Sequence, residues 1–473
     1  MASPSRSPPR SMQPHQGLPY PQRVWAILTV FCGLIMAVLD GSIANIALPS
    51  ISRELNAEAA STIWVVNAYQ LTVTICLLPL SSLGDILGYK RVYRTGLAIF
   101  LIGSLIAACA VNLPMLVAAR VIQGIGGAGI MSVNTALVRF IYPPTKLGRG
   151  IGLNALVVGV TIAVGPSLGA LILGISSWQW LFAVNVPVAI VALWISRWAL
   201  PDTPAQPRAF DYPSAVLSAV VFGMFILGVD SMGHATLRVV GAIGIALAIV
   251  LGWLLVRRQR GRPAPLVPVD LFASRAFTLA VGTSFCSFMT QMLAFVALPF
   301  YLEYQLGRSL QETGLLITPW PLMVALMAAL SGRLSDRYPA SILAGAGLIM
   351  LTTGLIGLAW LSPTASSFDI AWRTALCGIG FGFFQSPNNR AMIGATPRER
   401  SGGASGAQAT TRLLGQTTGT AVVALLFSLD NAGAARTALF AAAGVAAIGA
   451  IISFSRLRDA QPAPAEGAAE PDA

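Results

Sequence analysis

The segment Ser81–Arg91, SSLGDILGYKR, directly follows a long apolar run, and a shorter form of it, GRLSDR at 332–337, follows another. Both segments read small-x-Leu-small-Asp, and their aspartates, Asp85 and Asp336, are 251 positions apart. Two glycine-rich segments, QGIG and CGIG, are 254 positions apart. Landmarks that recur at nearly one offset predict two related halves joined in one chain.

The composition places these halves in a membrane. Of the 473 residues, 55% are hydrophobic and 10% are charged, whereas about 25% of the residues of a soluble protein are charged. The mean hydropathy is +0.72. These values exclude a soluble multidomain enzyme, a disordered chain and a disulfide scaffold. We therefore predict an all-α polytopic membrane protein.

Apolar runs of about 20 residues, the length that crosses ~30 Å of hydrocarbon, fall into three groups. We expect about fourteen spans, arranged as six, two and six. The runs lie at 24–47, 62–82, 92–111, 113–137, 150–174 and 179–199, then 212–231 and 237–256, then 276–301, 313–332, 340–361, 370–393, 402–428 and 435–455. This division predicts a disordered tail at 1–23, a six-helix bundle at 24–199, a linker with two additional helices at 200–275, a second bundle at 276–457 and a tail at 458–473.

Basic residues gather on one side of this arrangement. Of the 30 Lys and Arg residues, 23 fall in the two tails and in the loops after every second span. Cytoplasmic loops carry such an excess, so we expect both termini in the cytoplasm and the chain in the cytoplasmic membrane. The net charge of +12 follows from this orientation, and no nucleic acid is expected as a partner.

Two segments of the first half are distinctive: LDGSIANIALP at Leu39–Pro49 and WVVNAY at Trp64–Tyr69. They resemble motifs of the major facilitator superfamily, and within it of the fourteen-helix drug:proton antiporter group. So do, in the same order along the chain, the segments 81–91, 116–128 and 159–170. The resemblance implies two six-helix bundles with two additional central transmembrane helices, and export of small molecules in exchange for protons.

Asp40 and Arg120 are charged residues inside predicted spans, where charges are costly and usually face a partner or a water-filled cavity. Burial disfavours an ionised carboxylate and a nearby cation favours it, so such a group can hold or release a proton as its surroundings change. In the resembling motif the arginine takes part in proton coupling, and we expect Asp40 and Arg120 to be partners. The alternatives are a packing or capping role for Asp40 and a purely structural ion pair.

Polar, aromatic and methionine side chains within the spans are candidates to line a substrate cavity. Gln123 is equally suited to bind a substrate or a neighbouring helix, and Arg412 resembles a fixed arginine of the antiporter group. Methionine and aromatic residues are also expected on lipid-facing helices, so composition does not separate the two positions. The candidates are Asn45, Gln123, Asn67, Tyr69, Met292, Trp320 and Arg412. The sequence assigns no role to Asp230, His234 or Glu303.

In the family, the loop motif latches the two bundles together on the inside while the cavity is open outward. The resemblance implies such a cytoplasmic gate here, with the candidates Asp85, Gly88, Lys90, Arg91, Asp336 and Arg337. The sequence departs from the family's pattern at Ser81, Ile86 and Tyr89, so we expect a weaker latch. The alternative is a solvated turn with the basic residues typical of cytoplasmic loops.

The segment 159–170 combines small residues with a proline. Small residues allow helices to approach closely, and a proline inside a helix removes a backbone donor and bends the axis. Gly159, Gly165, Pro166 and Gly169 resemble the family's antiporter motif, which is associated with exchange and favours export here. Generic glycine packing is the alternative.

The chain carries no ATP-binding or enzymatic motif. A Walker A loop needs Gly-Lys before Ser or Thr, and neither Lys90 nor Lys146 stands in that context; no metal or cofactor is expected. We therefore expect a secondary transporter, acting as a monomer, that exports amphipathic cationic or neutral drugs or biocides in exchange for protons by alternating access. The alternatives are a dedicated metabolite exporter or importer and a membrane-embedded sensor or assembly subunit that transports nothing.

Overall fold

The computed structural model describes residues 17–459, except for 58, 63, 204, 206–208, 233–237, 263–264 and 430–432, and no strand occurs among them. The first half contains α1 (Tyr20–Glu54), α2 (Ala59–Thr62), α3 (Trp64–Leu87), α4 (Tyr89–Ala108), α5 (Leu113–Ile141), α6 (Leu147–Ile175), α7 (Trp180–Ala183) and α8 (Asn185–Ala199). The middle contains α9 (Tyr212–Met232) and α10 (Arg238–Gln259). The second half contains α11 (Arg275–Phe300), α12 (Leu310–Ile317), α13 (Pro319–Leu334), α14 (Ala340–Ala359), α15 (Ser367–Gly394), α16 (Ser401–Leu429) and α17 (Ala434–Ser455).

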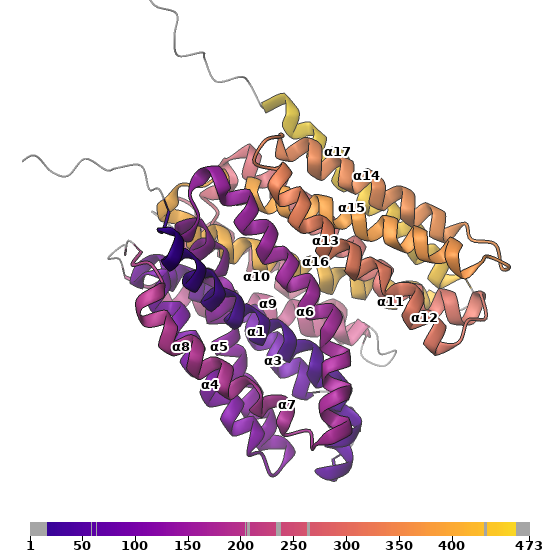
Figure 1. Ribbon diagram of the computed structural model, residues 1–473, viewed down its shortest axis with the longest axis horizontal. Coiled ribbons are helices and arrows are strands. Elements are labelled where there is room, and N and C mark those ends of the chain that lie inside the picture. The colour runs from indigo at the N-terminus through magenta and orange to yellow at the C-terminus, as the bar shows by residue number, and fades with distance from the viewer. Residues whose placement is uncertain are drawn as a thin grey trace, which may run out of the picture.

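The two halves form two helical bodies that lie against each other (Figure 1). The indigo-to-magenta helices form one body and the orange-to-yellow helices the other. Helices α6 and α13 pack together across the boundary, as do α3 and α16. Helix α1 begins and α17 ends toward the upper left of the view, so both lie at the same end of the molecule.

Eleven helices of the described chain are long and apolar enough to cross a membrane. Three further helices of at least 28 residues, α6, α15 and α16, are not among them. In α15 the reason is polarity, because buried Gln385, Asn388 and Asn389 face the protein interior and lower the mean hydropathy. The expected count of fourteen spans therefore stays a prediction.

The first helix begins earlier than the sequence predicts. Helix α1 starts at Tyr20, whereas the expected tail extends to residue 23. The amide of Leu18 donates a hydrogen bond to the carbonyl of Ile141 (3.1 Å), and the Arg23 guanidinium donates to the carbonyl of Leu18. These bonds attach residues 18–23 to the end of α5, which apolar periodicity alone does not reveal. The rest of the predicted tail, 1–16, lies outside the described residues.

The additional helices are central in the sequence but peripheral in the structure. Helices α9 and α10 pack mainly on each other, and α9 also contacts α3 and α16. Much of α10 is exposed, including Val239 and Ile249, as expected of a lipid-facing surface. Asp211 accepts hydrogen bonds from Ser214 (2.6 Å) and Gln259 (3.0 Å), which tie the start of α9 to the end of α10. Burial by itself raises the pKa of Asp211, but these hydrogen bonds outweigh it and hold that pKa below its usual value.

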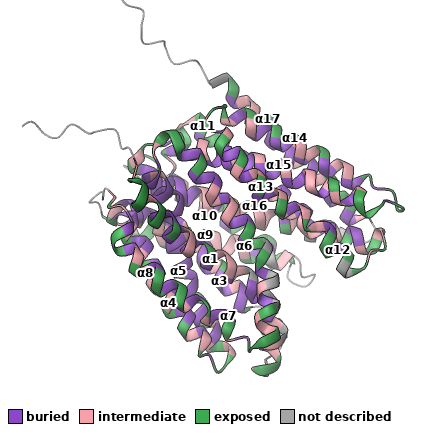
Figure 2. Ribbon diagram, viewed as in Figure 1, coloured by how far each residue is buried: buried purple, intermediate pink, exposed green. Residues whose placement is uncertain are grey.

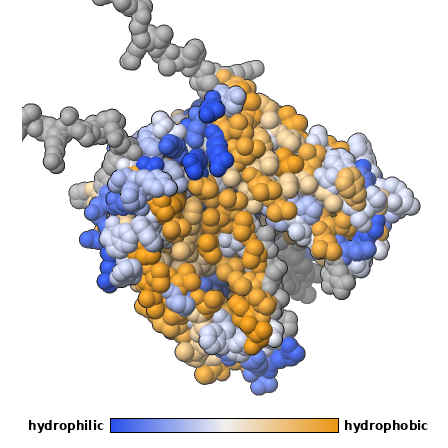
Figure 3. All heavy atoms as spheres, in the orientation of Figure 1, coloured by the Kyte–Doolittle hydropathy of each residue, from blue (hydrophilic) through white to orange (hydrophobic). Residues whose placement is uncertain are grey.

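The outer surface is apolar between polar ends. Figure 3 shows hydrophobic side chains over the middle of the visible face and hydrophilic ones gathered toward its extremities. Figure 2 shows the exposed positions along the outward sides of the helices and the buried ones between them. Exposed tryptophans such as Trp194 and Trp253 are tolerated on such a surface because lipid solvates apolar groups.

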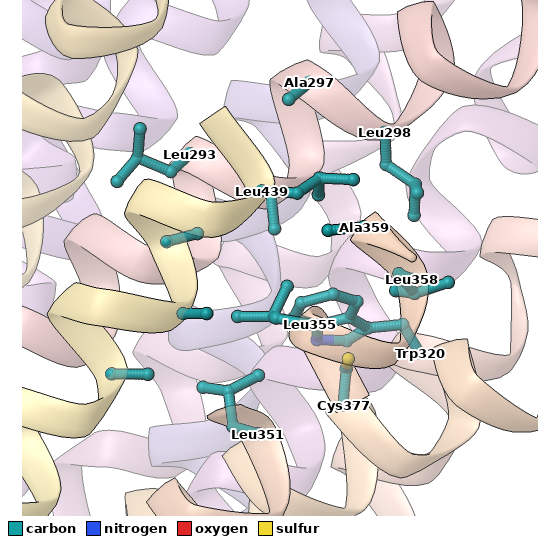
Figure 4. Packing of buried hydrophobic residues seen from close by; sticks show 14 of the residues in the cluster. Leu293, Ala297, Leu298, Trp320, Leu351, Leu355, Leu358, Ala359, Cys377 and Leu439 are labelled. Carbon is teal, nitrogen blue, oxygen red and sulfur yellow. The ribbon is translucent and has the colours of Figure 1, made fainter. Parts of the chain in front are cut away.

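Each half has its own apolar core. In the second half, Trp320 is fully buried with Leu355 and Cys377 (Figure 4). Its ring lies 5.0 Å from that of Phe295, centroid to centroid. Trp320 is therefore a core residue in this structure and does not line the central cavity, so its place in a substrate site stays a prediction. On a helix that is apolar on nearly every side, periodicity does not show which face meets the bundle interior.

In the first half, glycines bring α4 and α5 into backbone contact. A Cβ added at Gly126 would lie 2.4 Å from the Phe100 backbone nitrogen and 2.7 Å from the Gly96 carbonyl oxygen. Helix backbone cannot move aside as a flexible side chain can. The pair can approach this closely only because no side chain stands at either glycine.

Replacing Gly126 by alanine is therefore expected to lower the free energy of unfolding by about 1–3 kcal/mol, the usual cost of overpacking. The measurement is thermal unfolding of the purified protein in detergent, followed by circular dichroism. The matched control is Gly174→Ala, because no atom lies within 4 Å of a Cβ added there. Equal melting temperatures for the two variants would contradict the close packing of α4 on α5.

Candidate functional site

A buried ion pair joins α1 to α5 inside the first half. One Nη of Arg120 donates a hydrogen bond to Oδ2 of Asp40. The Arg120 side chain is fully buried, and the Asp40 side chain is 1% exposed. The structure thus confirms that these two rare intramembrane charges are partners. Removing one partner of such a pair leaves an uncompensated buried charge, which is strongly unfavourable.

Hydrogen bonds from three other helical positions fix the orientation of the pair. Gln123 and Asn185 donate to Oδ1 of Asp40 at 3.3 and 3.1 Å. Arg120 donates through Nε to the carbonyl of Val65 (2.8 Å) and through Nη1 to Gln123 Oε1 (2.8 Å). The other terminal nitrogen of Arg120 has no hydrogen-bond partner among the described residues. Protonation of Asp40 would therefore leave the guanidinium without a counter-charge.

Tyr69 separates this pair from the space between the halves. Its ring lies 4.3 Å from the Arg120 guanidinium carbon, in a cation–π contact. Its hydroxyl donates to the carbonyl of Ala37 (2.7 Å) on α1. The same residue lines the central cavity. A change in the charge of the Asp40–Arg120 pair would thus act directly on a side chain that lines the cavity.

The central cavity has a volume of about 430 Å³ and lies between the halves. Its walls come from α1, α3, α5 and α6 of the first half and from α11, α13, α15 and α16 of the second. The predicted candidates Tyr69, Met292 and Arg412 line it, and so does Gly159 of the antiporter motif. Ligand cavities of about 300–1,000 Å³ are usual for small molecules, so the space suits one organic compound.

Other predicted cavity residues lie elsewhere. Gln123 is fully buried and donates to Ser104 (2.8 Å) as well as to Asp40, so it supports the ion pair and does not line the cavity. Asn67 is half-buried, and the α3 wall of the cavity consists of Tyr69, Gln70 and Val73. Asn67 precedes Gln70 by three residues, nearly one helical turn, so the two differ more in depth along α3 than in the face they occupy. The side chain of Asn45 lies outside the described residues.

Four glutamines that line the cavity are not among the residues predicted there. Three of them line the cavity from the second half and one from the first: Gln291, Gln385, Gln416 and Gln70. A signal was present, because a carboxamide inside an apolar span is expensive unless it finds a partner or faces a cavity.

Hydrogen bonds that join the halves cluster at one end of the molecule, which we call the closed end. Asp85, at the end of α3, accepts from the amide of Gly402 (3.0 Å), at the start of α16. Asp85 also forms an ion pair with Arg400 (3.2 Å), and Arg400 in turn pairs with Asp270 (2.8 Å). An aspartate at a helix N-terminus also interacts favourably with the helix dipole. The gate role of Asp85 remains a proposal. Its contacts with Gly402 and Arg400 connect the two halves, and we call such a set of contacts a lock.

The second half contributes the matching contact. Asp336 Oδ1 accepts from the amide of Gly148 (3.0 Å), at the start of α6, and pairs with Arg390 (3.4 Å). Gly148 and Gly402 are 254 positions apart, the offset of the glycine-rich segments. Each half thus caps a helix of the other with an aspartate from the end of its own repeated segment.

Tyr89, one of the departures from the family's pattern, takes part in the first lock. Its hydroxyl donates to Asp85 Oδ1 (2.8 Å) and accepts from the Gly402 amide (3.0 Å). The sequence predicts a weaker latch because the expected arginine is missing, yet the tyrosine adds two hydrogen bonds. Gly88 precedes it with φ of +88°, a conformation that favours glycine.

The remaining gate candidates are peripheral. Lys90 pairs with Asp202 (3.0 Å), whose side chain is 94% exposed, and both Arg91 and Arg337 are exposed. Exposed ion pairs contribute little because water screens them. None of the three joins the halves by a hydrogen bond among those formed by the described residues.

Replacing Lys90 by alanine is accordingly expected to change the free energy of unfolding by less than about 1 kcal/mol and to leave transport near the wild-type rate. Thermal unfolding and uptake into vesicles are the two measurements. A loss of transport comparable to that of an Asp85→Ala variant would show that Lys90 belongs to the lock.

The antiporter motif lies on α6, which faces α13 across the boundary. A Cβ added at Gly159 would meet Ala325 at 3.6 Å, an ordinary contact, so this glycine is not required by sterics alone. Gly165 and Gly169 are buried, and the side chain of Pro166 lies outside the described part of the chain. The α-helix runs unbroken through all four positions.

Of the three residues without an assigned role, the structure describes Glu303 fully. Glu303 stands in a π-helical turn, Tyr301–Gln305, that extends α11. The side chain of Asp230 and the whole of His234 lie outside the described residues.

Two repeated helical halves, membrane-spanning helices and a cavity between the halves define a membrane transporter. The chain belongs to the Major Facilitator Superfamily, whose model matches residues 30–420 and 280–472.

Relatives with curated names include both drug and vitamin transporters. The chain is 50% identical over 444 residues to the uncharacterized transporter YebQ of Escherichia coli (strain K12), covering 93% of this chain and 97% of that protein. It is 31% identical over 407 residues to the riboflavin transporter RibZ of Clostridioides difficile (strain 630), covering 85% and 88%. It is 30% identical over 401 residues to the multidrug resistance protein Stp of Mycobacterium tuberculosis (strain CDC 1551 / Oshkosh), covering 83% and 73%.

Solved structures share the fold at low sequence identity. The human organic anion transporter MFSD10 aligns with a TM-score of 0.68 and 15% identity, covering 91% of this chain and 99% of that one. The proton:xylose symporter XylE aligns with a TM-score of 0.65 and 13% identity, covering 92% and 96%. These likenesses concern the fold.

Proposed function

We propose that the protein is a proton-coupled exporter that exchanges amphipathic organic compounds for protons by alternating access. The observation that carries the proposal is the buried Asp40–Arg120 pair, which one side chain, Tyr69, separates from the central cavity. A relative at 30% identity is named a multidrug resistance protein, and the motif at 159–170 favours exchange over uptake.

The geometry suggests how proton and substrate would be linked. With Asp40 ionised, the carboxylate holds Arg120 against Val65 and beneath Tyr69. With Asp40 protonated, the guanidinium loses its counter-charge and the hydrogen bonds around it must change. A ligand in the cavity shifts the balance between these states only if it binds one of them more tightly. Tyr69 contacts both the ion pair and the cavity, so through it protonation of Asp40 and binding of substrate would favour or oppose each other.

The alternating-access part of the proposal draws on the locks at the closed end. The positive-inside pattern predicts that this end faces the cytoplasm. In the described conformation both aspartate locks are formed, so the cavity is sealed from that end by Asp85 and Asp336 with their partners. Export then requires that both locks open to admit substrate and re-form before release.

A dedicated metabolite transporter is the second candidate. The 31% identity to a riboflavin transporter and the four glutamines on the cavity wall favour a compound with defined hydrogen-bonding groups. Competition separates the two candidates, because a multidrug exporter is inhibited by many unrelated compounds and a dedicated one by a single class.

The test uses purified protein in liposomes with an acidic lumen and a pH-sensitive dye inside. Under the proposal, addition of a transported compound outside raises the lumenal pH, since each molecule that enters is exchanged for protons. Empty liposomes are the control. If no compound of a broad panel moves protons while the protein still binds some of them, proton coupling fails, and a sensor or assembly role becomes the better account.

A further inference from the structure

A small polar chamber lies between the halves at the inner end of the cavity. Its volume is about 50 Å³, compared with about 430 Å³ for the cavity. Along α16, Gly402 stands at the closed end, Ser405 and Gln408 line the chamber, Arg412 lines both spaces and Thr420 lines the cavity. The chamber is thus the part of the central space nearest the closed end.

The chamber wall presents polar atoms that the protein leaves unpaired. Oxygens of Asn134, Gln385 and Asn389 have no hydrogen-bond partner among the described residues, although these side chains are only 4%, 7% and 6% exposed. The same holds for the hydroxyl of Ser405, which is 1% exposed, and for an oxygen of Gln408. Buried polar groups are normally satisfied, and unpaired ones are costly. The carboxamide oxygens accept hydrogen bonds, but the Ser405 hydroxyl can donate one, and Gln385 and Asn389 present NH2 donors when their carboxamides turn by about 180°. The chamber can therefore supply donors to an acidic guest.

The charge of the combined space comes from one residue. Among the described residues that line the cavity and the chamber, Arg412 is the only charged one. Its Nε is buried and has no hydrogen-bond partner in the described chain. The carboxylate of Asp40 does not compensate it, because Arg120 already occupies that group behind Tyr69. A cationic compound would meet repulsion here with no counter-charge, whereas an anion would supply one.

We propose that the transported compounds are amphipathic organic anions, whose acidic group enters the chamber beside Arg412 while the apolar body occupies the cavity. The inference rests on the proposed transport function and deepens it. A space of about 50 Å³ admits a carboxylate but not a ring system. The rings and thioether of Phe288, Phe295 and Met292 line the larger space, where an aromatic body fits. Anions therefore replace the cationic or neutral compounds that the sequence led us to expect.

Three probes of one shape test the charge preference: 2-naphthoate, 2-naphthamide and 2-naphthylmethylammonium. Binding to the purified wild-type protein in phosphatidylcholine nanodiscs is measured by calorimetry. We expect naphthoate to bind at least about tenfold more tightly than either analogue, the size of effect typical of a charge-assisted hydrogen bond in a buried site. Equal affinities, a preference for the ammonium, or no binding of any probe would overturn the inference.

Variants locate the preference at the chamber. Arg412→Gln should remove the tenfold preference for naphthoate over naphthamide, whereas Arg412→Lys should retain most of that preference. Arg257→Gln, which removes an exposed positive charge on α10, is the charge-matched control and should retain all of it. A preference that survives Arg412→Gln would contradict the assignment, and Arg412→Lys keeps the test decisive if the glutamine variant does not fold.

Failure of this inference is distinguishable from failure of the proposed function. Naphthoate binding that depends on Arg412, without proton movement in liposomes, would support the anion site and exclude proton exchange. Proton movement driven by the ammonium probe but not by naphthoate would support exchange and overturn the anion site.

Discussion

Asp40→Asn is expected to abolish accumulation of substrate driven by a pH gradient or membrane potential while retaining exchange of substrate between two equal pools. Asparagine keeps the size of the side chain and can still accept from Gln123 and Asn185, but it cannot take up or release a proton. At 100 mV each proton supplies about 2.3 kcal/mol, which corresponds to roughly 50-fold accumulation. The Asp40→Asn variant should show none of this gradient-driven accumulation.

Comparing accumulation with exchange distinguishes a loss of proton coupling in Asp40→Asn from a loss of folded protein. Because Arg120 is left without a counter-charge, the variant is also expected to unfold more easily, by up to about 3–5 kcal/mol, so its transport is compared per folded molecule. Retained exchange with no gradient-driven accumulation identifies Asp40 as the proton site. Loss of both activities in a protein that still binds substrate would indicate a structural ion pair. Asp202→Asn, at a side chain that is 94% exposed, is the matched control.

Gly402→Ala is expected to open the closed end. A Cβ at this position would lie 2.3 Å from Oδ1 of Asp85 and 2.8 Å from the carbonyl of Ser81, so the lock cannot form without separation of α3 and α16. Overpacking of about 1–3 kcal/mol shifts a two-state equilibrium by about 5- to 150-fold. The open population should rise by that factor, and gradient-driven transport should fall because the locks no longer alternate.

Cysteine labelling measures this shift. A cysteine at position 405, at the chamber, should react faster with a membrane-impermeant thiol reagent added from the closed end when Gly402→Ala is present. Gly403→Ala is a closely matched control, since the atoms nearest to its added Cβ are 3.5 Å away. Unchanged labelling in Gly402→Ala, or an equal increase in Gly403→Ala, would show that the lock does not control access.

Some of the site could be predicted because rare residues carry it. Asp40 and Arg120 stand out as charges within apolar runs, and the paired loop aspartates stand out through the repeat. Both signals depend on residue identity and spacing, which the sequence contains directly. The two halves themselves follow from the same recurrence.

Other features depend on which face of a helix meets the cavity, and apolar periodicity does not give that direction in a membrane. Trp320 and Met292 are equivalent as hydrophobic residues, yet one is core and the other lines the cavity. Lipid and bundle interior are both apolar, so no polar stripe marks the outside of a helix. For the same reason the sequence does not predict the chamber, because its wall comes from six helices of both halves.

Under the proposed function, the two aspartate locks would also determine how often the protein changes conformation without cargo. They use different helices and share no hydrogen-bonding partner, so the free energies of breaking them are expected to add. If each lock alone opened once in a hundred times, both would be open together about once in ten thousand. If the protein exchanges substrate for protons as proposed, the two locks would then protect the ion gradient across the membrane from leakage while no cargo is present.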